Sequence, residues 1–154
     1  MVFAPADLER DDVRDLLRLH LADARKDACT AAYDAARLSE PDMELFALRD
    51  PTGALLGIAA LKTLPVTDGV AGDGEVKSVR THPDHLRRGV AHRLMDGIEA
   101  EARRRGMARL LLETHPTDAY AAARRLYESR GYAYRGPFGD YAARPGSVFM
   151  QIVL

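Results

Sequence analysis

Residues 79 to 92 read Val79-Arg80-Thr81-His82-Pro83-Asp84-His85-Leu86-Arg87-Arg88-Gly89-Val90-Ala91-His92. This pattern predicts that a strand ends before Pro83 and that a helix opens with basic residues around Gly89. The first amides of a helix have no intrahelical acceptors, and together with the helix dipole they attract anions. Gly89 lets a ligand approach the backbone closely, while Arg87 and Arg88 add positive charge. The stretch therefore predicts a phosphate or pyrophosphate site.

The residues on either side predict strands and helices in alternation, a mixed α/β order. A strand is expected over Glu75 to Thr81, with Glu75, Lys77, Val79 and Thr81 on one face. Further elements are predicted at helix Leu86 to Arg105, strand Met107 to Glu113, helix Asp118 to Arg130, and strands Tyr132 to Arg135 and Ser147 to Val153. Toward the N-terminus the predictions are strand Val2 to Ala4, a helix capped by Asp7 or Asp11, a weaker helix Ala28 to Leu38, and a hairpin of Met43 to Leu48 with Ala54 to Leu64.

Length and composition predict one globular domain over residues 1–154, with 47% hydrophobic and 29% charged residues. The longest apolar run, Ala54 to Leu61, is far shorter than the roughly twenty residues of a membrane-spanning helix. An acidic start in place of a secretory signal favours a cytoplasmic protein. The single cysteine, Cys29, is interpreted as a small helix residue, and a net charge of −1 argues against a nucleic-acid partner.

Two segments resemble the GNAT superfamily of N-acetyltransferases. Leu86-Arg87-Arg88-Gly89-Val90-Ala91 is similar to the family turn that holds the coenzyme A pyrophosphate, with Leu86 where the family has Arg or Gln. Ala123-Arg124-Arg125-Leu126-Tyr127-Glu128-Ser129-Arg130-Gly131-Tyr132 is similar to the family's Ala-x-x-Leu-Tyr-x-x-x-Gly-Phe/Tyr segment. Tyr120 stands where the family often has asparagine. The resemblance is close over about residues 75 to 135.

The resemblance implies a twisted, mostly antiparallel mixed sheet of about six to seven strands flanked by about four helices. It also implies acetyl-CoA as co-substrate for transfer of the acetyl group to a primary amine, without an acyl-enzyme intermediate. The coenzyme-binding residues it implies are Val79, Arg80, Thr81, Arg87, Arg88, Gly89, Val90, Ala91 and His92. The main-chain N–H of Val79 or a neighbour would polarise the thioester carbonyl.

Amine acylation needs a base for the amine and an acid for the departing thiolate. Glu75 is the candidate base, with Asp73 or a water-only route as alternatives. Glu75 could instead pair with Lys77 or an arginine on a solvated strand face. Tyr127 matches the family tyrosine that protonates the thiolate, although its place on an apolar helix stripe also fits a core residue.

The loop after residue 135 is the candidate acceptor-binding segment, with Phe138, Asp140 and Tyr141 as the residues of interest. A tight connector between two strands is the alternative reading. The acceptor is predicted to be a small-molecule or peptide amine, and the resemblance makes a homodimer possible. The histidines lack the spacing of a metal site, so no metal is expected. A catalytically inactive coenzyme A-binding regulator is the alternative function.

Overall fold

The computed structural model describes residues 1–26, 35–66, 72–139, 141 and 146–154. Within these residues seven strands form one sheet in the order β1-β2-β3-β4-β5-β7-β6. The strands are β1 (Val2–Pro5), β2 (Met43–Arg49), β3 (Leu55–Thr63), β4 (Gly74–Thr81), β5 (Arg109–Thr114), β6 (Ala133–Arg135) and β7 (Val148–Val153). The helices are α1 (Asp11–Lys26), α2 (Ala35–Leu38), α3 (Val90–Arg104) and α4 (Ala121–Ser129), with short 3-10 turns η1 (Pro83–His85) and η2 (Asp118–Tyr120). The predicted mixed, mostly antiparallel fold is confirmed.

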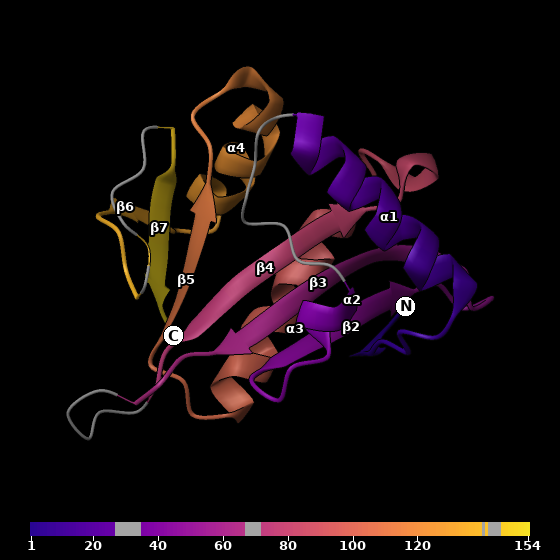
Figure 1. Ribbon diagram of the computed structural model, residues 1–154, viewed down its shortest axis with the longest axis horizontal. Coiled ribbons are helices and arrows are strands. Elements are labelled where there is room, and N and C mark those ends of the chain that lie inside the picture. Colours follow the sequence, from indigo (N-terminus) through magenta and orange to yellow (C-terminus); the bar gives the residue numbers. More distant parts are fainter. Residues whose placement is uncertain (27–34, 67–71, 140, 142–145) are drawn as a thin grey trace.

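Pairing along the sheet is antiparallel except between β4 and β5. These two strands are parallel because α3 carries the chain across between them. The β4–β5 ladder contains only two pairs, Gly74 with Leu110 and Glu75 with Leu111. Figure 1 shows the two strands together at these residues and apart toward their carboxyl ends. The sheet is therefore open in its middle, between two strands that each pair fully on their other side.

The two faces of the sheet carry different helices (Figure 1). On one face α1 buries Val13, Leu16 and Leu17 against β2 and β3. On the other face α3 buries a stripe that includes Leu94 and Ile98, with three-and-four spacing, and α4 joins the same cluster through Tyr127. We call the first the α1 face and the second the α3 face.

A buried ion pair holds α4 against α3. Arg130, at the end of α4, donates hydrogen bonds of 2.8 Å to both carboxylate oxygens of Glu99 and another of 2.8 Å to Asp96. The Glu99 and Arg130 side chains are 9% and 14% exposed. Removing one partner of such a pair leaves a charge poorly solvated, so this contact fixes the position of α4 and of Tyr127 within it.

Two predicted helices differ from the observed ones. The helix expected from Leu86 begins at Val90, because Arg87 (φ 58°) and Gly89 (φ 73°) adopt left-handed backbone conformations that interrupt a right-handed helix. Of the helix expected over Ala28 to Leu38, only α2 lies within the described residues, and Cys29 lies outside them. No helix in the described part of the chain combines the length and apolar character required to cross a bilayer.

Candidate active site

The predicted anion site consists of backbone at the start of α3. Among the described residues, no acceptor receives the backbone N–H of any residue from Arg87 to His92, and the first helical bond runs from the Arg93 N–H to the Gly89 carbonyl. A Cβ atom built on Gly89 would meet no atom within 4 Å. Unpaired amides next to open space at a helix start provide the donors and the room that a phosphate group requires.

Basic side chains surround these amides. Arg87, Arg88 and His92 are exposed, whereas Val90 is buried and anchors the first helical turn in the core. The His82 ring caps η1 by accepting a hydrogen bond from the Asp84 backbone N–H at 3.3 Å. The structure thus brings the predicted loop residues, Arg87 through His92, to one end of α3.

A bulge in β4 corrects the predicted alternation of this strand. Opposite β3, Lys77 pairs with Ala60 and Arg80 with Ile58, so Ser78 and Val79 together face the single residue Ala59. Ser78 takes the left-handed conformation that the extra residue demands (φ 51°). Glu75, Lys77 and Arg80 therefore lie on the α1 face, while Val79 packs into the core of the α3 face. The prediction that Val79 and Thr81 share a face with Glu75 is wrong.

The end of β4 is tied to α1. Arg80 donates a 2.6 Å hydrogen bond to Asp23, and its Nε is a buried nitrogen without a partner. His20, one turn earlier in α1, is half-buried beside this pair. Burial first, and the Arg80 charge second, lower the pKa of His20 to about 4. Of the predicted coenzyme residues, Val79, Arg80 and Thr81 thus lie at the open end of β4, one turn before the α3 loop.

Glu75 is buried in a closed set of contacts. Its carboxylate lies 2.9 Å from the Lys77 ammonium, and the two side chains are 2% and 4% exposed. The Tyr141 hydroxyl donates to the same Glu75 oxygen and also bonds to Lys77, whose Nζ lies 5.1 Å from the Tyr141 ring centroid. The pairing alternative for Glu75 is therefore what the structure contains, in a buried rather than a solvated form. Asp73, the other candidate base, is bound by Arg109 at 2.7 Å.

Tyr127 approaches from the α3 face. The residue is 7% exposed, its ring lies 5.7 Å from that of Tyr132, and burial raises the pKa of its hydroxyl to about 12. The hydroxyl bonds to no described residue, yet it is not among the enclosed polar atoms that lack partners. It therefore meets a surface as a neutral proton donor.

The predicted acceptor loop lies on the α1 face beside β5 and β7. Phe138 is 7% exposed and packs edge-on against Tyr141 and Phe149, with ring centroids 5.1 and 5.7 Å apart. Tyr141 bridges this aromatic cluster to Glu75 and Lys77. Asp140 lies outside the described residues. The loop thus contributes core aromatic rings and one hydroxyl to the site.

Sequence reasoning missed two orphaned polar atoms on the strands that diverge. Ser78 Oγ in β4 and Glu113 Oε2 in β5 are buried and have no hydrogen-bond partner. The residue types around Ser78 alternate as they would in a regular strand, so the sequence shows no sign of the bulge that buries the Ser78 hydroxyl oxygen. Glu113 does carry a signal, because an acid directly follows the buried run Leu110 to Leu112.

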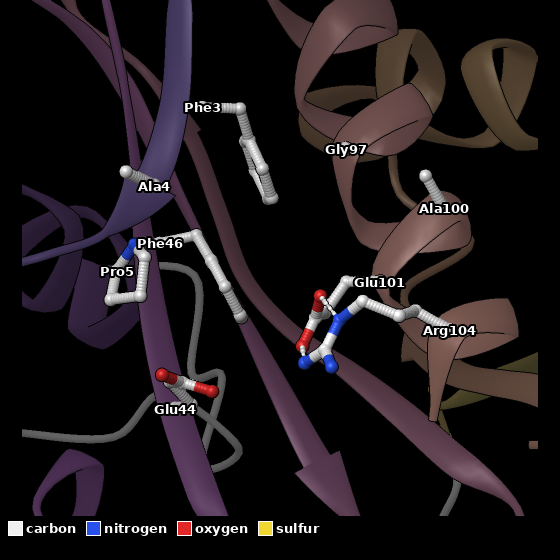
Figure 2. A pocket seen from close by; sticks show the side chains of 9 residues that line it. All are labelled: Phe3, Ala4, Pro5, Glu44, Phe46, Gly97, Ala100, Glu101 and Arg104. Carbon is white, nitrogen blue, oxygen red and sulfur yellow. Dashed lines mark hydrogen bonds and ion pairs between the residues drawn. The ribbon is translucent and has the colours of Figure 1, made fainter. Parts of the chain in front are cut away.

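A cavity of about 380 Å³ lies elsewhere, between β1, β2 and the second half of α3. Figure 2 shows Phe3 and Phe46 on one wall and Glu101 bonded to Arg104 on the other. None of the predicted site residues lines this cavity. In the described part of the chain, no three His, Cys, Asp or Glu side chains gather as a metal site.

Comparison with known proteins matches residues 10–132 to the model of the acetyltransferase (GNAT) family. The chain is 47% identical over 96 residues to the N-acetyltransferase YsnE of Bacillus subtilis, itself described as uncharacterized; this match spans 62% of the chain and 60% of that relative. It is 33% identical over 151 residues to YedL of Escherichia coli, described in the same terms, across 96% of the chain and 91% of YedL. A Klebsiella pneumoniae structure described provisionally as an acyl-CoA N-acyltransferase superposes with a TM-score of 0.75 at 27% identity, over 99% of this chain and 97% of that one.

Proposed function

Because the chain belongs to the GNAT family of acetyltransferases, we propose that residues 1–154 form a single domain that transfers an acetyl group from acetyl-CoA to a primary amine of a small molecule or peptide. The observation that carries this proposal is the start of α3. There the amides from Arg87 to His92 lack acceptors, and Gly89 leaves open space beside them. A diphosphate supplies the oxygens that such amides require.

The remainder of acetyl-CoA would follow the opening between β4 and β5. Beyond Glu75, β4 pairs with β3 alone, so the side of the strand toward β5 offers main-chain groups to a ligand. The bulge at Ser78 and Val79 turns the backbone at this edge. The N–H of Val79 or a neighbour is the proposed donor to the thioester carbonyl, where it would stabilise negative charge on the oxygen during attack.

Tyr127 is the proposed acid. Tyr127 belongs to the hydrophobic cluster of the α3 face, and its raised pKa of about 12 keeps the hydroxyl protonated at neutral pH. A thiolate leaving the acetyl carbon would take this proton. Because the Tyr127 hydroxyl bonds to no described residue, no other contact competes for it.

Ligand binding tests the first half of the proposal. Calorimetric titration with coenzyme A is expected to show saturable binding to one site, and dephospho-coenzyme A to show altered affinity. Failure to bind any coenzyme A species would refute the proposal.

Turnover tests the second half. Thiol release from acetyl-CoA is measured with spermidine, kanamycin, lysine and an alanyl peptide, each as the added amine. Amine-dependent release supports an N-acetyltransferase, whereas binding without release for all four indicates the regulatory alternative.

A further inference from the structure

Most charged side chains on the α1 face of β4 and β5 are paired with a side chain of opposite charge. Lys77 and Glu75 form one buried pair, and Arg80 and Asp23 form another. Arg109 and Asp73 close the start of β5 in the same way. Each of these carboxylates has a cationic side chain within 3 Å, so none of them needs a charge from a ligand.

Glu113 in β5 is the exception among the described carboxylates of this face. One of its oxygens, Oε1, accepts a 2.8 Å hydrogen bond from the Ser147 hydroxyl. The other, Oε2, is buried and unpartnered, and Glu113 forms no ion pair with a described residue. A buried carboxylate oxygen without a donor costs free energy, and a cation or proton supplied by a ligand would remove that cost.

Strand register places Glu113 at the opening. Leu111 is the last β5 residue that pairs with β4, and Glu113 follows it on the same face of the strand. Its antiparallel partner in β7 is Phe149, which belongs to the aromatic cluster of Phe138 on the α1 face. Tyr127 lies on the opposite face. Glu113 and Tyr127 therefore belong to opposite faces of the sheet, and the proposed thioester position lies between these faces.

We propose that Glu113 is the catalytic residue that binds the acceptor amine as a cation and takes its proton, so that the acceptor is a cationic primary amine. This inference rests on the proposed function. Ser147 holds one carboxylate oxygen and leaves the other for the substrate. Glu75, held by Lys77 and Tyr141, serves the structure of the site.

In the proposed reaction every proton that leaves one group is taken up by another. The Glu113 carboxylate takes one proton from the ammonium to give a neutral amine, whose lone pair forms the nitrogen–carbon bond at the thioester carbonyl. The carbon–sulfur bond breaks with its electron pair on sulfur, and the thiolate takes the Tyr127 proton. The second amine proton returns to Tyr127 through water, and Glu113 releases its own to solvent. Ammonium and acetyl-CoA thus give amide, coenzyme A and one proton.

The test compares Glu113→Gln with Glu44→Gln, the same change at a half-buried glutamate in β2. With spermidine, which is cationic near neutral pH, Glu113→Gln is expected to lower kcat/KM by about 10²-fold or more. With hydroxylamine, which is neutral there, the loss is expected to be less than about tenfold. Raising the pH supplies free amine from solution and is expected to restore much of the lost rate. Coenzyme A affinity should be unchanged in both variants.

A purely structural role for Glu113 predicts other results. In that case Glu113→Gln would lower the melting temperature. It would also lower kcat/KM equally with both nucleophiles, with no recovery at high pH, and the inference would be wrong. Our assignment predicts an unchanged or raised melting temperature, because the amide removes an unpaired buried charge. Wild-type turnover that persists in Glu113→Gln also refutes the assignment while leaving the proposed function intact. Absence of any coenzyme A binding or turnover in the wild type refutes the proposed function itself.

Discussion

The two ends of the candidate active site are built from different parts of the chain. The proposed coenzyme end is one continuous stretch from Val79 to His92, and its proposed binding groups are backbone amides beside exposed side chains. The proposed acceptor end collects side chains from β4, β5, the loop at Tyr141 and the residues before β7. A continuous stretch of backbone can bind a constant ligand with few constraints on side chains. Specificity for a variable acceptor requires side chains that only the complete fold brings together.

The energetics of the two ends differ in the same way. In the loop from Arg87 to Gly89, substitutions change exposed positions and are expected to alter coenzyme affinity while leaving stability nearly intact. At the acceptor end, Glu75 and Lys77 are nearly inaccessible to water, so substitutions there are expected to alter stability first. Four predictions test this contrast, in order of decreasing effect.

The largest effect is expected from Lys77→Met. It leaves the Glu75 carboxylate buried without its cation, and we expect a loss of about 3–5 kcal/mol in the free energy of unfolding, measured by urea denaturation. Lys62→Met on β3 is the matched control. Its ammonium lies 3.9 Å from Asp42 in a more exposed pair, so a change below about 1 kcal/mol is expected.

A double variant sharpens this result. Glu75→Gln combined with Lys77→Met removes both charges, and we expect it to recover most of the lost stability. A Lys77→Met protein as stable as the control would show that the Glu75 charge is solvated or neutral, and the contrast between the two ends would fail.

The next effect is expected at the coenzyme end from Gly89→Asp. The added carboxylate would stand near the proposed diphosphate, and repulsion between unit charges about 4 Å apart near a protein surface is about 4 kcal/mol. We expect coenzyme A affinity to fall by about 10²- to 10³-fold in calorimetric titration. Aspartate tolerates the left-handed conformation better than most residues, which limits the cost in folding.

Gly53→Asp is the control for this change. Gly53 also has a positive φ, 89°, and open space around its Cβ position, but it lies in the β2–β3 turn. We expect equal destabilisation with unchanged coenzyme affinity. Equal affinity losses in the two variants would mean that the start of α3 is not the diphosphate site.

The same contrast explains how far the sequence alone could be interpreted. The strand–turn–helix geometry at the start of α3 was predictable because Pro83, Gly89 and the adjacent arginines encode it locally. The strands and helices were predictable for a similar reason, since hairpin and helix signals act over short distances, whereas the sheet that they form was implied by the family resemblance. The contact of Glu75 with Tyr141 was not predictable, because Tyr141 lies 66 residues away and meets Glu75 only across the folded sheet. The β4 bulge also escaped prediction, because one inserted residue reverses alternation without a distinctive residue type.

A third prediction concerns the chemical step between the two ends. Tyr127→Phe is expected to lower kcat by about 10²-fold, or about 3 kcal/mol in activation free energy, with unchanged coenzyme A affinity. Stability should change little, because the Tyr127 hydroxyl bonds to no described residue. Tyr132→Phe makes the same change in the adjacent buried ring, whose hydroxyl contacts Glu99 at 3.4 Å. If both variants lowered kcat equally, packing and not proton donation would explain the effect.

The smallest effect is expected from acid at the contact between α1 and the end of β4. His20 binds protons less readily in the folded chain, where its pKa is about 4, than when unfolded, where it is near its ordinary 6.5. Between these pH values the unfolded state binds more protons than the folded state. The contribution of His20 to the free energy of unfolding is therefore fully present above about pH 6.5 and declines as the pH falls toward 4. The free energies of unfolding measured in urea at pH about 7 and about 5 should differ by about 1–2 kcal/mol on this account.

In His20→Gln the difference should largely vanish, whereas His92→Gln, which alters an exposed histidine at the coenzyme end, should retain it. A pH dependence that survives His20→Gln would place its origin in another titratable group and would show that the contact of His20 with Arg80 and Asp23 does not set it.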